Sequence, residues 1–81
     1  MKVLIIRFSS IGDIVLTTPV IRAVSQQARA EVHFLTKRSF GAVLKGNPYI
    51  HKIWLLEDDL ASVINELKKE SFDHVIDLHN N

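Results

Sequence analysis

Residues 3–8 form an almost unbroken apolar run, Val-Leu-Ile-Ile-Arg-Phe, that is rich in β-branched side chains. A strand with one face in water alternates apolar and polar residues, whereas a continuous apolar run is typical of a strand buried on both faces of a parallel sheet. Parallel neighbours need a crossover connection, usually a helix. We therefore expect an α/β fold in which this run is a central strand.

The helical pattern that follows this strand is interrupted by a proline. Apolar residues recur with helical spacing at Ile11, Ile14, Val15, Ile21, Val24 and Ala28. Pro19 falls inside the pattern, and a proline in a helix interior costs about 3 kcal/mol. We expect a break near Thr17-Thr18, with Thr18 as the N-cap and Pro19 at the first position of a second helix. A kinked continuous helix is the alternative.

Three more strands are predicted, at residues 32–36, 52–56 and 74–78. A short helix over residues 39–45 is expected between the first two of them, ended by Gly46-Asn47-Pro48. A longer helix, capped by Asp58 or Asp59, precedes the last strand. Its apolar face consists of Leu60, Val63, Ile64 and Leu67.

This alternation predicts a Rossmann-like, doubly wound parallel sheet with strand order 3-2-1-4. With right-handed crossovers, the helical segments after the first two strands cover one face and the last helix covers the other. Open α/β sheets bind ligands where the strand order reverses, here between strands one and four. Two loops flank that point. They are residues 9–13, Ser-Ser-Ile-Gly-Asp, and residues 79–81, His-Asn-Asn.

Composition excludes several classes of function. The chain has 81 residues, no cysteine and a formal net charge of +1. The missing thiols remove disulfides, thiolate metal sites and thiol catalysis, which fits a cytoplasmic setting. The near-neutral charge gives no footprint for nucleic acid. The first apolar run is too short for a signal peptide or a membrane span.

Residues 9–13 have two interpretations. Serine and aspartate are preferred helix caps, so Ser9, Ser10 and Asp13 could serve only to start a helix. Alternatively, the hydroxyls, the open backbone of Gly12 and the carboxylate of Asp13 bind a ligand. The loop matches neither a dinucleotide fingerprint nor a P-loop, and its acid would repel a pyrophosphate. A neutral, hydroxyl-bearing ligand fits better.

The remaining polar residues that could take part in a site are the histidines, the asparagines at the end of the chain and Arg7. The four histidines share no local ligand spacing, so we expect no metal site. His79, Asn80 and Asn81 either contact the ligand or form an ordinary polar loop. Arg7, near the carboxyl end of the first strand, either reaches an acidic sugar or extends to the surface.

Several motifs together resemble a known family. Residues 3–19, VLIIRFSSIGDIVLTTP, are similar to the amino terminus of the bacterial lipopolysaccharide heptosyltransferases of glycosyltransferase family 9. Residues 46–50, GNPYI, and 72–79, FDHVIDLH, resemble the family's later spacing. The resemblance implies a GT-B enzyme of two Rossmann-like domains, of which residues 1–81 would be part of the amino-terminal, acceptor-side domain. The carboxyl-terminal nucleotide-sugar domain would be absent.

The resemblance also implies a reaction and its residues. An inverting transferase would move heptose from ADP-heptose to the lipopolysaccharide core, without a further cofactor. Asp13 matches the general base, and Ser9, Ser10 and Gly12 belong to the same motif, with His79 and Asn80 as further acceptor contacts. The full-length enzyme could associate peripherally with a membrane.

Two alternatives remain open from the sequence. One is a small flavodoxin-like binding module without catalysis, and the other is a family 9 transferase that uses another sugar donor. The last predicted strand has an unpaired outer edge, which is prone to pair with another chain. We therefore expect the 81 residues alone to be inactive, and either to self-associate or to be only marginally stable.

Overall fold

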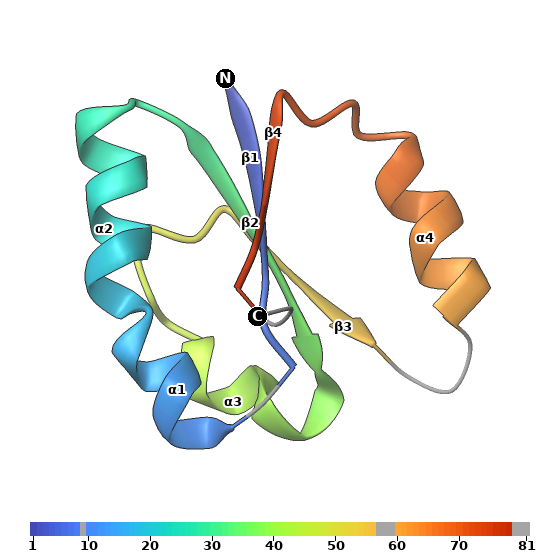
Figure 1. Ribbon diagram of the computed structural model, residues 1–81, viewed down its shortest axis with the longest axis horizontal. Helices are drawn as coiled ribbons and strands as arrows, with labels where there is room; N and C mark the ends of the chain where they lie inside the picture. Colours follow the sequence, from blue (N-terminus) through green and yellow to red (C-terminus); the bar gives the residue numbers. More distant parts are fainter. Residues whose placement is uncertain (9, 57–59, 79–81) are drawn as a thin grey trace.

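The computed structural model describes residues 1–8, 10–56 and 60–78. Strands alternate with helices along the chain, as expected of an α/β fold (Figure 1). The elements are β1 (Lys2–Ile6), α1 (Ile11–Leu16), α2 (Thr18–Gln27), β2 (Glu31–Lys37), the 3-10 helix η1 (Arg38–Phe40), α3 (Gly41–Leu44), β3 (Lys52–Leu56), α4 (Leu60–Lys68) and β4 (His74–Asp77).

The sheet has the order β3-β2-β1-β4, and its pairings are parallel. The strand order predicted from the sequence is therefore confirmed. Figure 1 shows α1, α2 and α3 on one side of the sheet and α4 on the other, as the crossover argument required. The order reverses between β1 and β4, so the carboxyl ends of these two strands flank the switch point.

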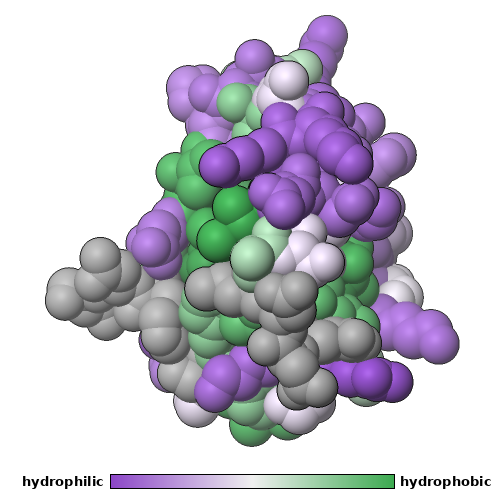
Figure 2. Space-filling model, turned by 90° about the vertical axis from the view of Figure 1, so that its right-hand side faces the viewer, coloured by the Kyte–Doolittle hydropathy of each residue, from purple (hydrophilic) through white to green (hydrophobic). Residues whose placement is uncertain are grey.

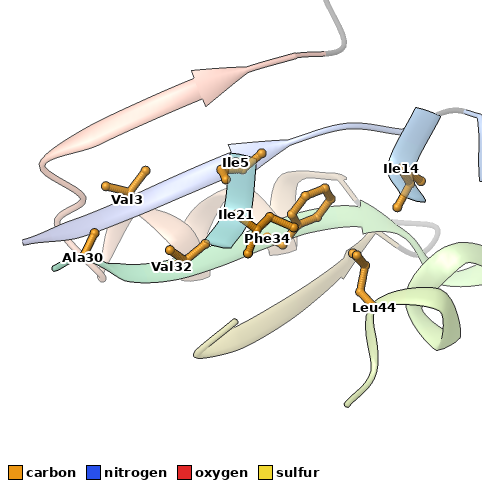
Figure 3. Close-up of a cluster of buried hydrophobic side chains, with 8 residues drawn as sticks. All are labelled: Val3, Ile5, Ile14, Ile21, Ala30, Val32, Phe34 and Leu44. Atoms are coloured by element: carbon orange, nitrogen blue, oxygen red, sulfur yellow. The ribbon is translucent and has the colours of Figure 1, made fainter. Parts of the chain in front are cut away.

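The core lies between the sheet and the α1–α3 layer (Figure 3). In β1, the side chains of Val3, Leu4 and Ile5 are buried on both faces of the sheet, which is what the continuous apolar run predicted. The buried cluster on the helix side consists of Val3, Ile5, Ile14, Ile21, Ala30, Val32, Phe34 and Leu44. Since Ile14 and Ile21 come from α1 and α2, both helices are fixed to the sheet by their apolar faces.

The break predicted before Pro19 is confirmed, but the predicted cap is wrong by one residue. Thr17, not Thr18, lies between the two helices and is the N-cap of α2. Pro19 then occupies the first turn, where a missing N–H breaks no helical hydrogen bond. The Thr18 hydroxyl donates back to the carbonyl of Val15 at 2.9 Å, so it belongs to the helical turn instead of capping it.

Other element ends differ from the predictions by a few residues. β1 ends at Ile6 instead of Phe8, although the Arg7 N–H still donates to the carbonyl of Leu35 at 3.2 Å. The segment predicted as one short helix is η1 followed by α3, and α3 ends at Leu44. Gly46 follows with φ 90°, a left-handed conformation that favours glycine. The predicted caps Asp58 and Asp59 lie outside the described residues.

The α4 side of the sheet is less completely covered. Val75 of β4 is 57% exposed and Ile64 of α4 is 39% exposed. Both residues line an apolar groove of about 270 Å³, together with Leu4 and Phe72 among others. Figure 2 shows hydrophobic surface on this side of the molecule. None of the helices in the described ranges is both long enough and apolar enough to cross a bilayer.

Candidate functional site

The start of α1 brings together three of the predicted site residues. Ser10 is the N-cap, with extended backbone, and Asp13 occupies the third position of the helix. The Asp13 carboxylate reaches back and accepts hydrogen bonds from the Ser10 N–H at 3.2 Å and from the Ser10 hydroxyl at 3.1 Å. This is the carboxylate half of a capping box, so the capping role is real. The Asp13 side chain is nevertheless 47% exposed and open to a ligand.

Arg7 ties this helix start to the sheet. One guanidinium nitrogen, Nη2, lies 3.0 Å from Asp13 Oδ2, and the other, Nη1, donates to the carbonyl of Leu78, just after β4. The side chain is only 19% exposed, so it does not extend to the surface as one interpretation of the sequence had it. Arg7 thus connects the ends of β1 and β4 across the switch point.

These contacts set the charge of Asp13. The hydrogen bond from the Ser10 backbone, then those from Arg7 and the Ser10 hydroxyl, lower the pKa of the Asp13 carboxyl below its usual value, against a smaller opposing effect of burial. Asp13 is therefore ionised at neutral pH and can only accept hydrogen bonds or protons.

Gly12 leaves the surface of α1 open. A Cβ added at this position would meet no atom within 4 Å, and Gly12 lies within a helix. Neither packing nor backbone conformation therefore requires a glycine here. What a glycine does provide is an uncovered stretch of backbone beside Asp13, which a ligand can approach closely.

Three predicted site residues, Ser9, His79 and Asn80, lie outside the described residues. The structure adds Arg7 to the site, a residue for which the sequence offers two interpretations without deciding between them. Its position at the carboxyl end of a central strand, directly before the loop, was the available signal.

A groove of about 580 Å³ runs along α2 on the helix side of the sheet. It is lined by Arg22, Gln26 and Tyr49, among others, and Asp13 is not among its lining residues. We place the candidate site at the start of α1 instead, because that is where an ionised carboxylate and the switch point of the sheet coincide.

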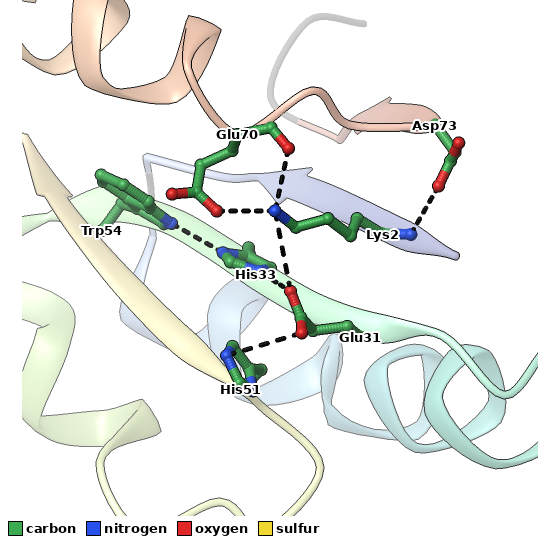
Figure 4. A network of polar contacts seen from close by, with 7 residues as sticks. All are labelled: Lys2, Glu31, His33, His51, Trp54, Glu70 and Asp73. Carbon is green, nitrogen blue, oxygen red and sulfur yellow. Dashed lines mark hydrogen bonds and ion pairs between the residues drawn. The ribbon is translucent and has the colours of Figure 1, made fainter.

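At the opposite, amino edge of the sheet, Glu31, His33 and His51 lie close enough for their ligand-type atoms to fall within 4.8 Å of one another. Glu31 and His33 are two residues apart in β2, and the pairing of β2 with β3 brings His51, the residue before β3, beside them (Figure 4). The sequence did not predict this cluster, because the position of His51 depends on that pairing. The Trp54 indole N–H donates to His33 Nδ1 at 2.9 Å. Since an indole can only donate, His33 carries its proton on Nε2, which lies 2.7 Å from a Glu31 oxygen. In this arrangement His33 offers a metal ion no free lone pair.

The same edge is held by ion pairs around Lys2. Its Nζ lies 2.8 Å from a carboxylate oxygen of Glu70, and its backbone N–H donates to Asp73 at 2.7 Å (Figure 4). The hydrogen bond to Glu70 raises the pKa of Lys2, and the same contact lowers the pKa of Glu70. The pKa of Glu31 is lowered first by its hydrogen bond with His33. These contacts join the starts of the strands, so we assign them to stability.

Comparisons with known proteins agree with the resemblance expected from the motifs. No family model matches the chain. Lipopolysaccharide heptosyltransferase 1 of Campylobacter coli is 29% identical over 85 residues, which covers 96% of this chain and 25% of that protein. A glycosyl transferase of family 9 from Veillonella parvula has the same fold, with a TM-score of 0.86 at 21% identity, over 99% of this chain and 26% of that one.

The chain thus spans about a quarter of the length of each of these relatives. The solved structure shows that the fold is shared, and the curated relative extends the likeness to the sequence. The chain is therefore heptosyltransferase-like along nearly its whole length, and its fold matches part of a family 9 glycosyltransferase.

Proposed function

We propose that this chain is the acceptor-side part of a longer, inverting glycosyltransferase that moves heptose from ADP-heptose to a hydroxyl of the lipopolysaccharide core. The observation that carries the proposal is Asp13, an ionised and half-exposed carboxylate at the carboxyl edge of the sheet. The relative from Campylobacter coli supports the choice of sugar and acceptor, since it is named a lipopolysaccharide heptosyltransferase.

The position of Asp13 supports a role in binding or catalysis beyond capping. Open α/β sheets bind ligands outside the carboxyl ends of their strands, at the point where the strand order reverses. In this sheet that point lies between β1 and β4, and Arg7 contacts both Asp13 and the backbone just after β4. An acceptor seated there would meet the Asp13 carboxylate and the open backbone of Gly12.

In the proposed reaction, Asp13 takes the proton of the acceptor hydroxyl as the hydroxyl oxygen attacks the anomeric carbon of the donor. A new carbon–oxygen bond forms on one face of the sugar while the bond to the diphosphate oxygen breaks on the other, so ADP leaves and the anomeric centre inverts. A base works best when its pKa lies near the working pH. The lowered pKa of Asp13 opposes this, and exclusion of water by a closing second domain would raise it.

The other predicted site residues act as acceptor contacts in this proposal. Ser10 and Gly12 lie at the start of α1 with the base, Ser9 precedes Ser10 in the sequence, and His79 and Asn80 follow β4 in the sequence. The donor is held by a nucleotide-sugar domain outside these 81 residues, and no further cofactor is assigned. In this proposal the full-length enzyme works in the cytoplasm and associates peripherally with the membrane that holds the acceptor.

The test is made in the full-length protein with Asp13→Ala and Asp13→Asn. General base catalysis contributes about 10²- to 10⁴-fold, so we expect turnover to fall by that range while ADP-heptose still binds with its original affinity. Glu66→Gln is the matched control, because Glu66 is an exposed acid on α4, on the opposite face of the sheet, where it forms a surface ion pair with Lys69. Retained turnover in the Asp13 variants would contradict the assignment. A panel of nucleotide sugars, assayed with the original protein, decides the donor.

A further inference from the structure

The two oxygens of the Asp13 carboxylate have different surroundings. Oδ2 accepts from the Ser10 N–H, from the Ser10 hydroxyl and from Arg7 Nη2, at 3.2, 3.1 and 3.0 Å. Within residues 1–8, 10–56 and 60–78, Oδ1 has neither a hydrogen bond nor an ion pair. One oxygen is therefore saturated with donors, and the other is left for a further partner.

Arg7 is the contact that fixes this difference to the sheet. Ser10 precedes Asp13 by three residues and moves with the start of α1, so its hydrogen bonds alone do not set the direction of the carboxylate relative to β4. Arg7 does so, because its two guanidinium nitrogens contact Asp13 and the carbonyl of Leu78 at once. A planar fork can hold two partners in fixed directions, and a lysine ammonium on a flexible stem cannot.

We propose that Arg7 is a positioning residue, which with Ser10 engages Oδ2 and so presents Oδ1 of Asp13 as the atom that takes the acceptor proton. The inference rests on the proposed function and adds to it the identity of the accepting oxygen and the group that orients it. The torsion that rotates an aspartate carboxylate is broad and roughly two-fold, so without Arg7 the oxygens exchange places easily. A displacement of about 1 Å in a reacting group can cost about 10²-fold in rate.

The charge of Arg7 has a second, separable consequence. It contributes to the lowered pKa of Asp13 and so keeps the base ionised to lower pH. The acid limb of the profile of kcat/KM against pH reports that pKa in the free enzyme. Removing the charge therefore moves the limb to higher pH, whereas removing only the fork geometry leaves the limb in place and lowers kcat.

The experiment compares Arg7→Met and Arg7→Lys in the full-length transferase. For Arg7→Met we expect kcat to fall by about 10- to 100-fold, with a smaller change in the KM for the acceptor, and the acid limb to move to higher pH. For Arg7→Lys we expect a similar fall in kcat with the limb close to its original position. Arg22→Met, which removes an exposed arginine from α2, is expected to leave both unchanged.

An activity-independent measurement accompanies the kinetics. Titration of the Asp13 carboxyl by NMR, in the same protein with ¹³C-labelled aspartate, should show a higher pKa in Arg7→Met than in the original protein. An unmoved acid limb and an unmoved Asp13 titration in Arg7→Met would overturn the inference, as would full kcat in Arg7→Lys.

Failure of this inference is distinguishable from failure of the proposed function. If Asp13→Asn lowers turnover by the expected range while Arg7→Met changes neither the acid limb nor kcat, Asp13 remains the base and the positioning role of Arg7 is refuted. If Asp13→Asn keeps full turnover, both the proposed function and this inference are refuted, even where the NMR titration shows that Arg7 changes the pKa of Asp13.

Discussion

Ile14 links the candidate site to the core, and its truncation gives a sharp test of the fold. The side chain is fully buried within α1, next in sequence to Asp13. Ile14→Ala removes three buried carbon groups, and at about 0.8 kcal/mol for each the transfer loss is about 2.4 kcal/mol. The cavity left behind adds to this, so we expect a total destabilisation of about 3 to 4 kcal/mol.

The matched control is Ile11→Ala, the same substitution in the same helix, because Ile11 is 53% exposed. Urea unfolding of the 81-residue chain, followed by circular dichroism, should show a change within about 0.5 kcal/mol for Ile11→Ala. For Ile14→Ala the expected loss corresponds to a fall in Tm of about 12 to 30 °C. Since a chain of this size has a total stability of only about 4 to 12 kcal/mol, Ile14→Val, at about 0.5 to 1.5 kcal/mol, provides a milder variant.

Equal destabilisation by Ile14→Ala and Ile11→Ala would refute the packing of α1 on the sheet. So would a loss below about 1 kcal/mol for Ile14→Ala, since that is less than the transfer loss alone. Either result would also remove the support that the core gives to the position of Asp13.

Two further predictions concern the site and the amino edge. Gly12→Ala should raise the free energy of unfolding of the chain, measured by thermal unfolding, by up to about 1 kcal/mol, because a helical Cβ there meets no atom within 4 Å. In the transferase the same substitution should raise the KM for the acceptor. A destabilised Gly12→Ala chain would contradict the first expectation. Because the pKa values of Asp13, Glu31 and Glu70 are lowered in the folded state, their stabilisation is present above about pH 4.5 and is lost as the pH falls through the lowered values. The urea midpoint should therefore fall on acidification, and Glu70→Gln should reduce that fall; an identical pH dependence in the variant would count against the Lys2–Glu70 pair.

Only part of the candidate site could be predicted from the sequence. Ser10, Gly12 and Asp13 were identified because they are neighbours in the chain and follow a strand directly, so local structure already brings them together. The sequence does not decide the role of Arg7, because whether a long side chain turns inward or outward depends on what packs around it. The backbone at Leu78, far away in the sequence, provides the partner that turns it inward.

The same distinction applies to the fold. Local patterns are enough to predict which segments form strands and helices and where the long helix breaks, because hydrophobic period and the missing N–H of Pro19 act over a few residues. The observed ends of some elements differ from the predicted ends by one or two residues, as in β1 and at Thr17. The reason is that hydrogen bonds to neighbouring elements decide the last residue of a strand or helix.

Which polar side chains meet depends on the packing of distant segments. The cluster of Glu31, His33 and His51 depends on the pairing of β2 with β3, and Trp54 then determines which nitrogen of His33 carries the proton. The pair of Arg7 and Asp13 depends on how α1 packs beside the end of β1. Such contacts follow from strand register and helix packing across many residues, and no local pattern in the sequence encodes them.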